Sequence, residues 1–198
     1  MCPVSSFDSA PTASGVTNAG EASPDSQREA PAAVIARERV QVVDARNRPC
    51  GSAWRAEMRR YRFWHRATYI VVRNRRGELC VQHRTLTKEA FPGGLDLAAG
   101  GVVGAGEAVH VSARRELAEE LGIRAVALRH CLEFRYDEDG YRIFGSVYCV
   151  EWDGPLSLQA EEVASVAWMS PRRALELAGV TPDTRLALEL LLEREGDN

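Results

Sequence analysis

The sequence lacks a strong excess of either charge, a long hydrophobic run and any closely spaced pair of cysteines. Its 198 residues include 25 Lys or Arg and 28 Asp or Glu, a formal net charge of −3. This near balance excludes a protein that holds nucleic acid mainly through a broad basic surface. No apolar run approaches the roughly 20 residues that cross a bilayer, and the start resembles no signal peptide. We therefore expect no nucleic-acid polymer and no membrane as partners, and a cytoplasmic location.

The five cysteines are an odd number, lie far apart and include no CxxC pair. This spacing excludes a disulfide framework and a zinc site. Three of them lie inside apolar runs, where a cysteine usually acts as a small buried hydrophobic side chain. These three are Cys80, Cys131 and Cys149.

Large apolar side chains are scarce in the first 34 residues, which are rich in Ala, Ser, Pro, Gly and Thr. Such a segment cannot bury enough surface to offset the conformational entropy that ordering would remove. The composition predicts a disordered N-terminal arm over residues 1–34 and one folded domain over residues 35–198. The globular part, from about Arg37 to Glu195, has the size of a single domain.

Hydrophobic patterning in the folded part predicts alternating strands and helices. Runs rich in β-branched residues and bounded by polar turns indicate strands, and glycine or proline punctuation marks the helix ends. The predicted strands are Val40–Val43, Thr68–Val72, Glu78–Gln82, Val126–Phe134, Arg142–Trp152 and Val163–Met169. The predicted helices are Ala108–Leu121, Pro171–Ala178 and Pro182–Glu193. Strands in hairpins and crossovers, with helices between them, favour an α/β fold with a mixed sheet and helices packed on its faces.

Three glutamates gather on one turn of the first predicted helix. Glu116, Glu119 and Glu120 have i, i+3 and i+4 spacing, so their side chains fall within one arc of roughly 100°. Leu117 and Leu121 point elsewhere, toward the core. The three carboxylates repel one another, and no Lys stands on the same stripe to relieve them. A hard divalent cation such as Mg²⁺ would do so, while also binding phosphate oxygens of a substrate.

The spacing around this helix matches a known motif. From Gly101, fixed residues recur at Glu107, at Arg115–Leu117, at Glu119–Glu120 and at Gly122–Ile123. All nine fixed positions of the 23-residue Nudix box are present, and the chain resembles a Nudix hydrolase over its whole folded part. The resemblance implies a Nudix α/β/α sandwich and an enzyme that hydrolyses a phosphoanhydride bond.

The resemblance also implies a metal site and a mechanism. The divalent metal, Mg²⁺ or Mn²⁺, would be held by Glu116, Glu119 and Glu120, with the backbone carbonyl of Gly101 facing the same ion. The metal would stabilise charge on the diphosphate and prepare a water molecule for attack.

The other matched positions would support that site. Arg115 would orient the glutamates through an ion pair, which agrees with its i, i+4 relation to Glu119. Glu107 would brace the junction between loop and helix, and Gly122 suits the C-terminal cap. Gly104 and Gly106 let the backbone turn closely before the helix begins.

The flanking segments resemble isopentenyl-diphosphate isomerase, a Nudix-fold enzyme that does not hydrolyse its substrate. That isomerase carries a Cys-Gly-His-Pro sequence just before its degenerate box, where this chain has Gly100–Val103. It also takes two glutamates from the strand after the box, where this chain has Tyr141–Ile143. These departures favour hydrolysis and the poorly characterised YfcD-type Nudix branch, with isomerisation as the alternative.

Part of the isomerase resemblance concerns phosphate binding. Arg84 and Lys88 occupy the positions that contact the diphosphate in the isomerase, and two cations ahead of the metal helix suit phosphate oxygens. Surface cations are common, so solvated side chains are the other interpretation. His65 aligns with an isomerase metal ligand but lacks the partner ligands, which favours a packed or hydrogen-bonded histidine.

Two further features stay open. A general base outside the box could come from the acidic loop Glu133–Asp139 or from the pair Glu161–Glu162. Trp64, Phe91 and Trp168 could stack on a nucleobase or on a prenyl tail, although aromatic residues beside strands are more often core residues.

The function predicted from the sequence is Mg²⁺- or Mn²⁺-dependent hydrolysis of a diphosphate bond in a nucleoside-diphosphate-type small molecule. The alternatives are an isomerase-like enzyme and a non-catalytic diphosphate-binding domain. The expected partner is the small-molecule substrate, and a homodimer is a further option because Nudix relatives often pair.

Overall fold

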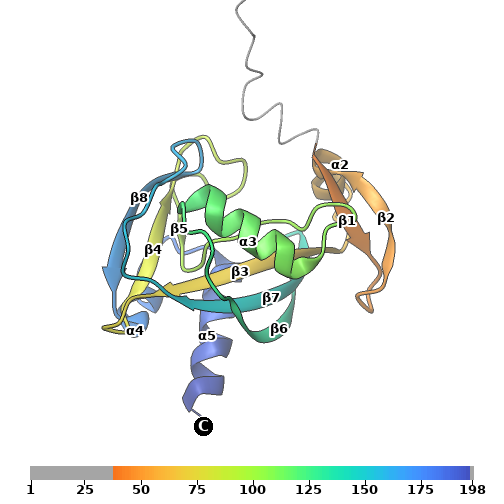
Figure 1. Ribbon diagram of the computed structural model, residues 1–198. Coiled ribbons are helices and arrows are strands. Elements are labelled where there is room, and N and C mark those ends of the chain that lie inside the picture. Colours follow the sequence, from red (N-terminus) through yellow and green to blue (C-terminus); the bar gives the residue numbers. More distant parts are fainter. Residues whose placement is uncertain (1–37, 197–198) are drawn as a thin grey trace, which may run out of the picture.

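The computed structural model describes residues 38–196, and the arm predicted over residues 1–34 lies outside the described residues (Figure 1). An eight-stranded sheet forms the centre of this part. Its main path runs through β2 (Pro49–Trp54), β1 (Arg39–Val43), β3 (His65–Arg73), β4 (Leu79–Arg84) and β5 (Leu95–Asp96).

The remaining strands join this path at β3 and β4. β6 (Arg129–Glu138) and β7 (Tyr141–Glu151) form a hairpin, and β7 pairs in parallel with β3. β8 (Val163–Met169) pairs antiparallel with β4. A parallel ladder among antiparallel ones makes the sheet mixed, as predicted.

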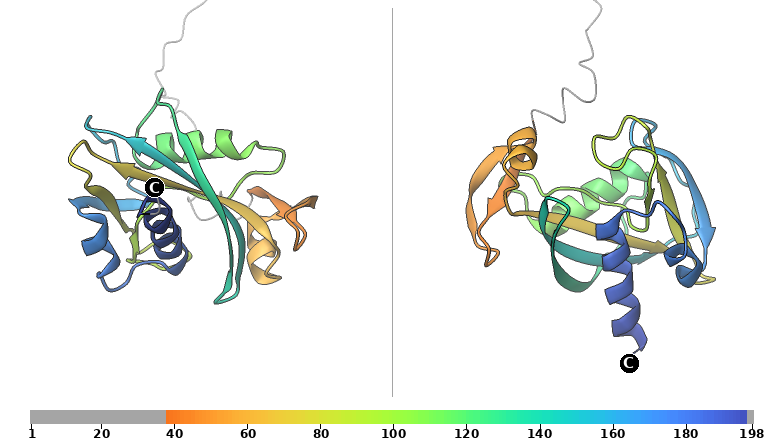
Figure 2. Two further views of the ribbon diagram at one scale, coloured as in Figure 1. Left: turned by 90° about the horizontal axis from the view of Figure 1, so that it is seen from below. Right: turned by 180° about the vertical axis from the view of Figure 1, so that it is seen from behind.

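Helices cover both faces of the sheet. α3 (Val109–Glu120) lies on one side, and α4 (Pro171–Leu175) and α5 (Pro182–Gly196) lie on the other (Figures 1 and 2). Ile70 of β3 packs in the same buried cluster as Leu117 of α3. The next residue, Val71, packs in the same cluster as Leu188 of α5. Because successive strand side chains point to opposite faces, β3 supports both cores, and the fold is an α/β/α sandwich.

A small N-terminal module, formed by β1, β2 and α2 (Arg55–Arg60), stands at one end of the sheet (Figure 1). Its buried cluster contains Val40, Ala53, Met58 and Val102. The backbone N–H of Trp54 donates to the Glu57 carboxylate at 3.1 Å, which fixes the first turn of α2. The module therefore positions α2 beside the start of β3.

Most predicted elements are confirmed. The hairpin of β3 and β4 forms, β8 has the predicted bounds, and α3 lies within its predicted range. Gly122 follows α3 with φ +71°, the left-handed conformation expected of a C-terminal cap. The chain turns between β6 and β7 with φ +52° at Asp139 and +83° at Gly140, as a tight hairpin turn requires.

Some element bounds differ from the prediction. β6 begins at Arg129 rather than Val126 and continues to Glu138, because Phe134 and Tyr136 alternate as buried residues up to the turn. α4 ends at Leu175, and α5 extends to Gly196. Neither β2 nor α2 nor β5 was predicted. β2 lacks β-branched residues, α2 has six residues, and β5 has two, so none carries a clear periodic pattern.

Within residues 38–196, no helix combines the length and apolar character that a membrane crossing needs. The four cysteines in this range are free. Cys80 and Cys131 are buried, which confirms their interpretation as core residues.

Candidate active site

The glycine-rich loop before α3 brings its backbone directly onto two glutamates of the helix. The N–H of Gly100 donates to Oε2 of Glu120 at 3.0 Å. A Cβ atom at Gly101 would lie 2.6 Å from Oε1 of Glu116, so any side chain there would displace the carboxylate. The carbonyl of Gly101 accepts the N–H of Thr68 at 2.9 Å. Loop and helix are thereby fixed against each other and against β3.

Arg115 joins three carboxylates at the exposed end of this site. It donates to Glu107 at 3.0 and 3.1 Å, to Glu116 at 2.8 Å and to Glu119 at 3.0 Å. These partners raise the pKa of Arg115, with the Glu107 hydrogen bonds as the largest cause. Glu107 also accepts the N–H of Gly104 at 3.0 Å, so it closes the loop while its bonds with Arg115 tie that loop to the helix. The geometry thus agrees with the bracing and orienting roles that the family resemblance implies.

Glu116 and Glu120 are carboxylates enclosed by protein, with relative exposures of 7% and 4%. Burial raises the pKa of Glu116 to about 7, although Arg115 and Arg55 lower it. Burial likewise raises the pKa of Glu120, with Lys88 opposing and Glu116 adding to the rise. Two buried acids in adjacent turns are costly unless a cation compensates them.

Lys88, the only lysine in the chain, lies beside the buried carboxylates. Its Nζ forms an ion pair with Glu162 and lies 3.9 Å from Oε1 of Glu120. Gln82 donates to the other oxygen of Glu120 at 3.4 Å. Two acidic segments were considered as the source of a general base. Glu162, from the Glu161–Glu162 pair, lies near Glu120 of α3 because Lys88 contacts both side chains.

Arg84, predicted with Lys88, has a different environment. Its guanidinium pairs with Asp96 and donates to the carbonyls of Ala90 at 2.7 Å and Phe91 at 3.2 Å. These bonds hold the segment between β4 and β5 in place. Arg84 also lines the cavity described below, and phosphate binding by Arg84 and Lys88 stays a prediction.

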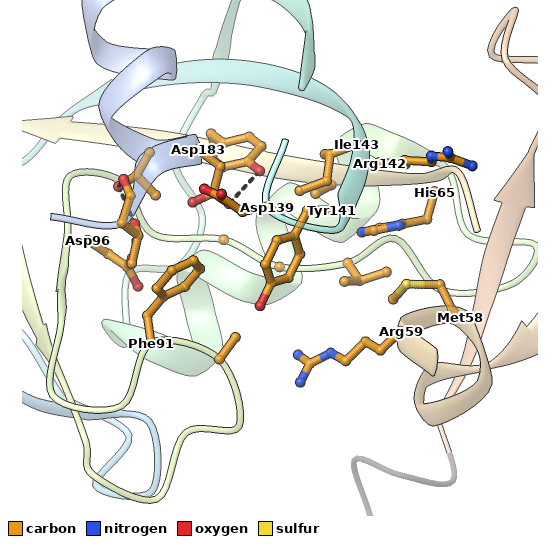
Figure 3. Close-up of a pocket in the computed structure, with 18 of the residues that line it drawn as sticks. Met58, Arg59, His65, Phe91, Asp96, Asp139, Tyr141, Arg142, Ile143 and Asp183 are labelled. Carbon is orange, nitrogen blue, oxygen red and sulfur yellow. Dashed lines mark hydrogen bonds between the residues drawn. The ribbon is translucent and has the colours of Figure 1, made fainter. Parts of the chain in front are cut away.

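A cavity of about 300 Å³ opens beside this site (Figure 3). Six cationic side chains line it: Arg55, Arg59, Arg62, Arg84, Lys88 and Arg142. Three acidic side chains do so as well: Asp96, Asp139 and Asp183. A chain with a net charge of −3 therefore presents mainly cations in this cavity, which favours an anionic ligand.

Buried polar groups and aromatic rings complete the walls. The hydroxyl of Tyr69 donates to Asp183 at 2.9 Å, the bond drawn dashed in Figure 3. Burial raises the pKa of Asp183, and Asp96 adds to the rise. Phe91 and Tyr141 stack with ring centroids 5.7 Å apart. The cavity thus offers a flat apolar surface beside charged groups.

The other aromatic candidates lie elsewhere. Trp64 packs on Phe144 at 4.9 Å between ring centroids, and the Arg135 guanidinium lies 4.4 Å from its ring centroid. Trp168 packs against the core beneath α3. Of the three aromatic residues considered, only Phe91 is among the cavity residues.

His65 is buried, and its Nδ1–H donates to the carbonyl of Phe63 at 3.0 Å. Burial lowers its pKa to about 4. A neutral, hydrogen-bonded histidine agrees with the packed interpretation of this residue.

Sequence reasoning did not identify several cavity residues. Arg55 and Arg59 belong to α2, which was not predicted, and Tyr69 and Asp183 meet across 114 positions of sequence. The clustering of arginines in residues 55–62 was the available signal, but charge runs are usually solvated.

The carboxylates of this site suit a hard cation that also binds phosphate oxygens of the substrate. Among the described residues, no group of three or more His, Cys, Asp or Glu side chains is arranged to hold a metal by itself. Glu119 instead pairs with Arg115, and its side chain is 48% exposed. Mg²⁺, however, is commonly held by one or two carboxylates plus substrate phosphate oxygens, and the buried pair Glu116 and Glu120 fits that mode.

Comparison with known proteins gives one consistent result. The NUDIX domain family model matches residues 63–191. An uncharacterised Nudix hydrolase of Pseudomonas aeruginosa, PA4841, is 48% identical over 154 residues, which cover 76% of this chain and 91% of the relative. The uncharacterised Nudix hydrolase YfcD of Escherichia coli K12 is 40% identical over 160 residues, covering 80% and 89%.

A solved structure agrees in fold. DR0079 of Deinococcus radiodurans superposes with a TM-score of 0.71 at 25% identity, covering 78% of this chain and 99% of that one. The match to the family model begins at residue 63, so α2 and its two cavity arginines lie outside it.

Proposed function

The chain belongs to the NUDIX domain family, whose members hydrolyse pyrophosphate-containing substrates, and from this premise we propose that it cleaves the phosphoanhydride bond of a nucleoside-diphosphate-type small molecule with Mg²⁺ or Mn²⁺. The observation that carries the proposal is the pair of buried carboxylates, Glu116 and Glu120, at the edge of a mainly cationic cavity. Protein carboxylates and substrate phosphates repel one another unless a cation stands between them.

The residues of the chain then have separate tasks. Glu116 and Glu120 would hold the metal, which would neutralise charge on the diphosphate and make water a better nucleophile. Arg115 and Glu107 keep the glutamates oriented, and the Gly101 backbone leaves room for the Glu116 carboxylate. Glu162 is a candidate for accepting a proton, with its carboxylate held by Lys88.

The test is a panel of nucleoside diphosphate derivatives assayed by mass, with Mg²⁺, with Mn²⁺ and with EDTA. We expect turnover only with a divalent metal, and a loss of at least about 100-fold in kcat/KM for Glu120→Gln, equivalent to about 2.7 kcal/mol. Glu161→Gln, an exposed neighbour of Glu162, is the matched control and should retain activity. Equal rates for the unmodified chain and Glu120→Gln would refute the metal role.

Metal binding has a second readout that does not need the substrate. Mg²⁺ should raise the melting temperature of the unmodified chain, because a ligand that binds the folded state stabilises it. The increase should be absent from Glu120→Gln and present in Glu161→Gln.

Two other functions give different results in the same panel. A non-catalytic diphosphate-binding domain would bind ligands tightly without turnover. An isomerase would convert isopentenyl diphosphate without releasing phosphate, and the relatives, named as hydrolases, do not favour it. Pairing of two copies stays a prediction that light scattering would test.

A further inference from the structure

Two arginines of α2, Arg55 and Arg59, line the cavity from outside the part of the chain that matches the family model. They lie four residues apart on one helix, so their side chains share a face. Arg60, the last residue of α2, is exposed, and its guanidinium lies 5.4 Å from the ring centroid of Tyr61. Arg55 and Arg59 therefore line the cavity, whereas Arg60 of the same helix lies on the surface.

Arg55 has unused hydrogen-bonding capacity. One of its terminal nitrogens donates to Glu38 at 2.6 Å. Its Nε is buried and has no hydrogen-bond partner among the described residues. Arg55 also lowers the pKa of Glu116 and of Glu162, so its charge acts on the same space as the glutamate helix.

Arg59 is held beside Arg55 against electrostatic repulsion. Burial lowers its pKa, and the neighbouring charge of Arg55 lowers it further. It forms an ion pair with Glu89, a side chain that is 58% exposed. Figure 3 shows Arg59 extending from α2, next to Met58, with its guanidinium end directed toward Tyr141. Two guanidinium groups facing one cavity, one of them with an unpartnered donor, are typical of an oxyanion site.

We propose that Arg55 and Arg59 bind phosphate oxygens of the ligand, so that α2 is an anion-binding wall of the cavity distinct from the Arg84–Lys88 side. The proposal rests on the proposed function for the identity of the ligand as a diphosphate compound. Glu89 then acts as an internal competitor, because its carboxylate occupies Arg59 when no phosphate is bound. Removing Glu89 should therefore strengthen phosphate binding, whereas a purely structural Arg59–Glu89 pair predicts the opposite or no change.

The experiment measures binding of imidodiphosphate, a diphosphate that is not hydrolysed, to the full chain by calorimetry in the presence of Mg²⁺. Arg59→Gln should weaken binding by about tenfold or more, as expected for loss of a charge-assisted hydrogen bond. Glu89→Gln should tighten it by about threefold, and Arg60→Gln should leave it unchanged. The melting temperature of each variant verifies that it folds, and Arg59→Lys should recover part of the affinity.

Two arms distinguish the source of the phosphate. If the site holds the scissile diphosphate, Arg59→Gln and Glu120→Gln both weaken imidodiphosphate binding. If the site holds a separate phosphate group, the binding of orthophosphate measured without Mg²⁺ is weakened by Arg59→Gln and is unaffected by Glu120→Gln. Either result supports an anion site on α2.

Other outcomes overturn the proposal or separate it from the proposed function. The proposal is overturned if Arg59→Gln leaves the binding of both imidodiphosphate and orthophosphate unchanged, if Glu89→Gln leaves binding unchanged or weaker, or if neither probe binds the unmodified chain, even if the substrate panel shows turnover. If binding depends on Arg59 but the substrate panel shows no turnover with any metal, the anion site on α2 is supported. The proposed hydrolysis of a diphosphate substrate is then refuted.

Discussion

Glu116 and Glu120 combine high burial with negative charge, which is unfavourable for stability. Their neighbours compensate only in part: Arg115 reaches Glu116 at 2.8 Å, and Lys88 lies 3.9 Å from Glu120 while pairing with Glu162. Folded proteins keep such groups where function requires them. The residue spacing alone predicted these two glutamates, but it could not predict their burial, because burial depends on the loop at Gly100 and Gly101.

Arg84 and Lys88 show the limit of residue-level prediction. Both were predicted as phosphate-binding cations from one resemblance. The guanidinium of Arg84 has donors in a fixed fork, which match Asp96 and two loop carbonyls. The ammonium of Lys88 is compact and lies between Glu120 and Glu162. Sequence position could not separate these environments, because the partners come from three different segments.

His65 gives a prediction for the pH dependence of stability. Its pKa is lowered by burial to about 4, against about 6.5 when unfolded. The unfolded chain therefore binds a proton more readily, so the contribution of neutral His65 is present above pH 6.5 and is lost as the pH falls toward 4. Between pH 7 and 4.5, we expect the unmodified chain to lose about 2 kcal/mol more unfolding free energy than His65→Asn.

Chemical denaturation at the two pH values measures this difference. The Asn side chain can still donate to the Phe63 carbonyl but does not titrate, so it is a matched reference. If both proteins lose the same unfolding free energy between pH 7 and pH 4.5, protonation of His65 does not destabilise the fold, which contradicts the prediction from its burial.

Among the elements, α3 and α2 differ most in how well sequence predicts them. α3 has twelve residues, buried apolar side chains four residues apart at Ala113, Leu117 and the following Leu121, and a glycine after its end, so its existence and bounds follow from local rules. α2 has six residues, four of them charged, and depends on Met58 packing against Val40 and Val102. Short helices of this kind are stabilised by tertiary contacts rather than propensity. The arginine cluster was therefore visible in the sequence, whereas the helix that turns two of these arginines to one face was not predictable.

The β6–β7 hairpin offers a prediction at the element scale. Gly145 of β7 stands opposite Phe134 of β6, and a Cβ atom on it would lie 2.3 Å from Cε1 of the Phe134 ring. The ring covers the glycine and also contacts Tyr69 at 5.1 Å between centroids. Gly145→Ala should lower the unfolding free energy by about 1–3 kcal/mol, because the ring must move within a packed core.

A double-mutant cycle with Phe134→Leu identifies the cause of this loss. If the clash with the ring is responsible, adding Gly145→Ala to the Leu background should cost at least about 0.5 kcal/mol less than in the unmodified chain. Strictly additive effects would instead point to the backbone of β7, and an unchanged unfolding free energy in Gly145→Ala alone would contradict the clash.

At the scale of the whole molecule, the alternation of β3 between two cores explains why composition and patterning were sufficient to predict an α/β fold. The parallel pairing of β3 with β7 was not predictable in register, because its partners are separated by 78 residues, as for His65 and Ile143. The cavity depends on that pairing, since Tyr141–Ile143 at the start of β7 and Tyr69 on β3 both line it. Patterning therefore predicts the layers, whereas long-range pairing builds the site.

The three buried clusters formed by residues 38–196 also differ greatly in size. The clusters on the two faces of the sheet contain eighteen and ten buried residues, whereas that of the N-terminal module contains four. Local opening is easiest where few apolar contacts must break. We therefore expect amide hydrogen exchange in β2 and α2 to be faster than in β3 and β7, measured by mass spectrometry on the full chain.

Ligand binding should reverse this order in part. If Arg55 and Arg59 bind phosphate oxygens, Mg²⁺ with imidodiphosphate must slow exchange in α2, because opening of the helix would break those contacts. The slowing should be greater in Glu89→Gln and absent in Arg59→Gln. Exchange in α2 as slow as in β3 without ligand would contradict the weak packing of the module, and slowing confined to α3 would mean that the module takes no part in binding. If the slowing in α2 is found as expected, the least stable unit of the fold is the one whose order depends on the ligand.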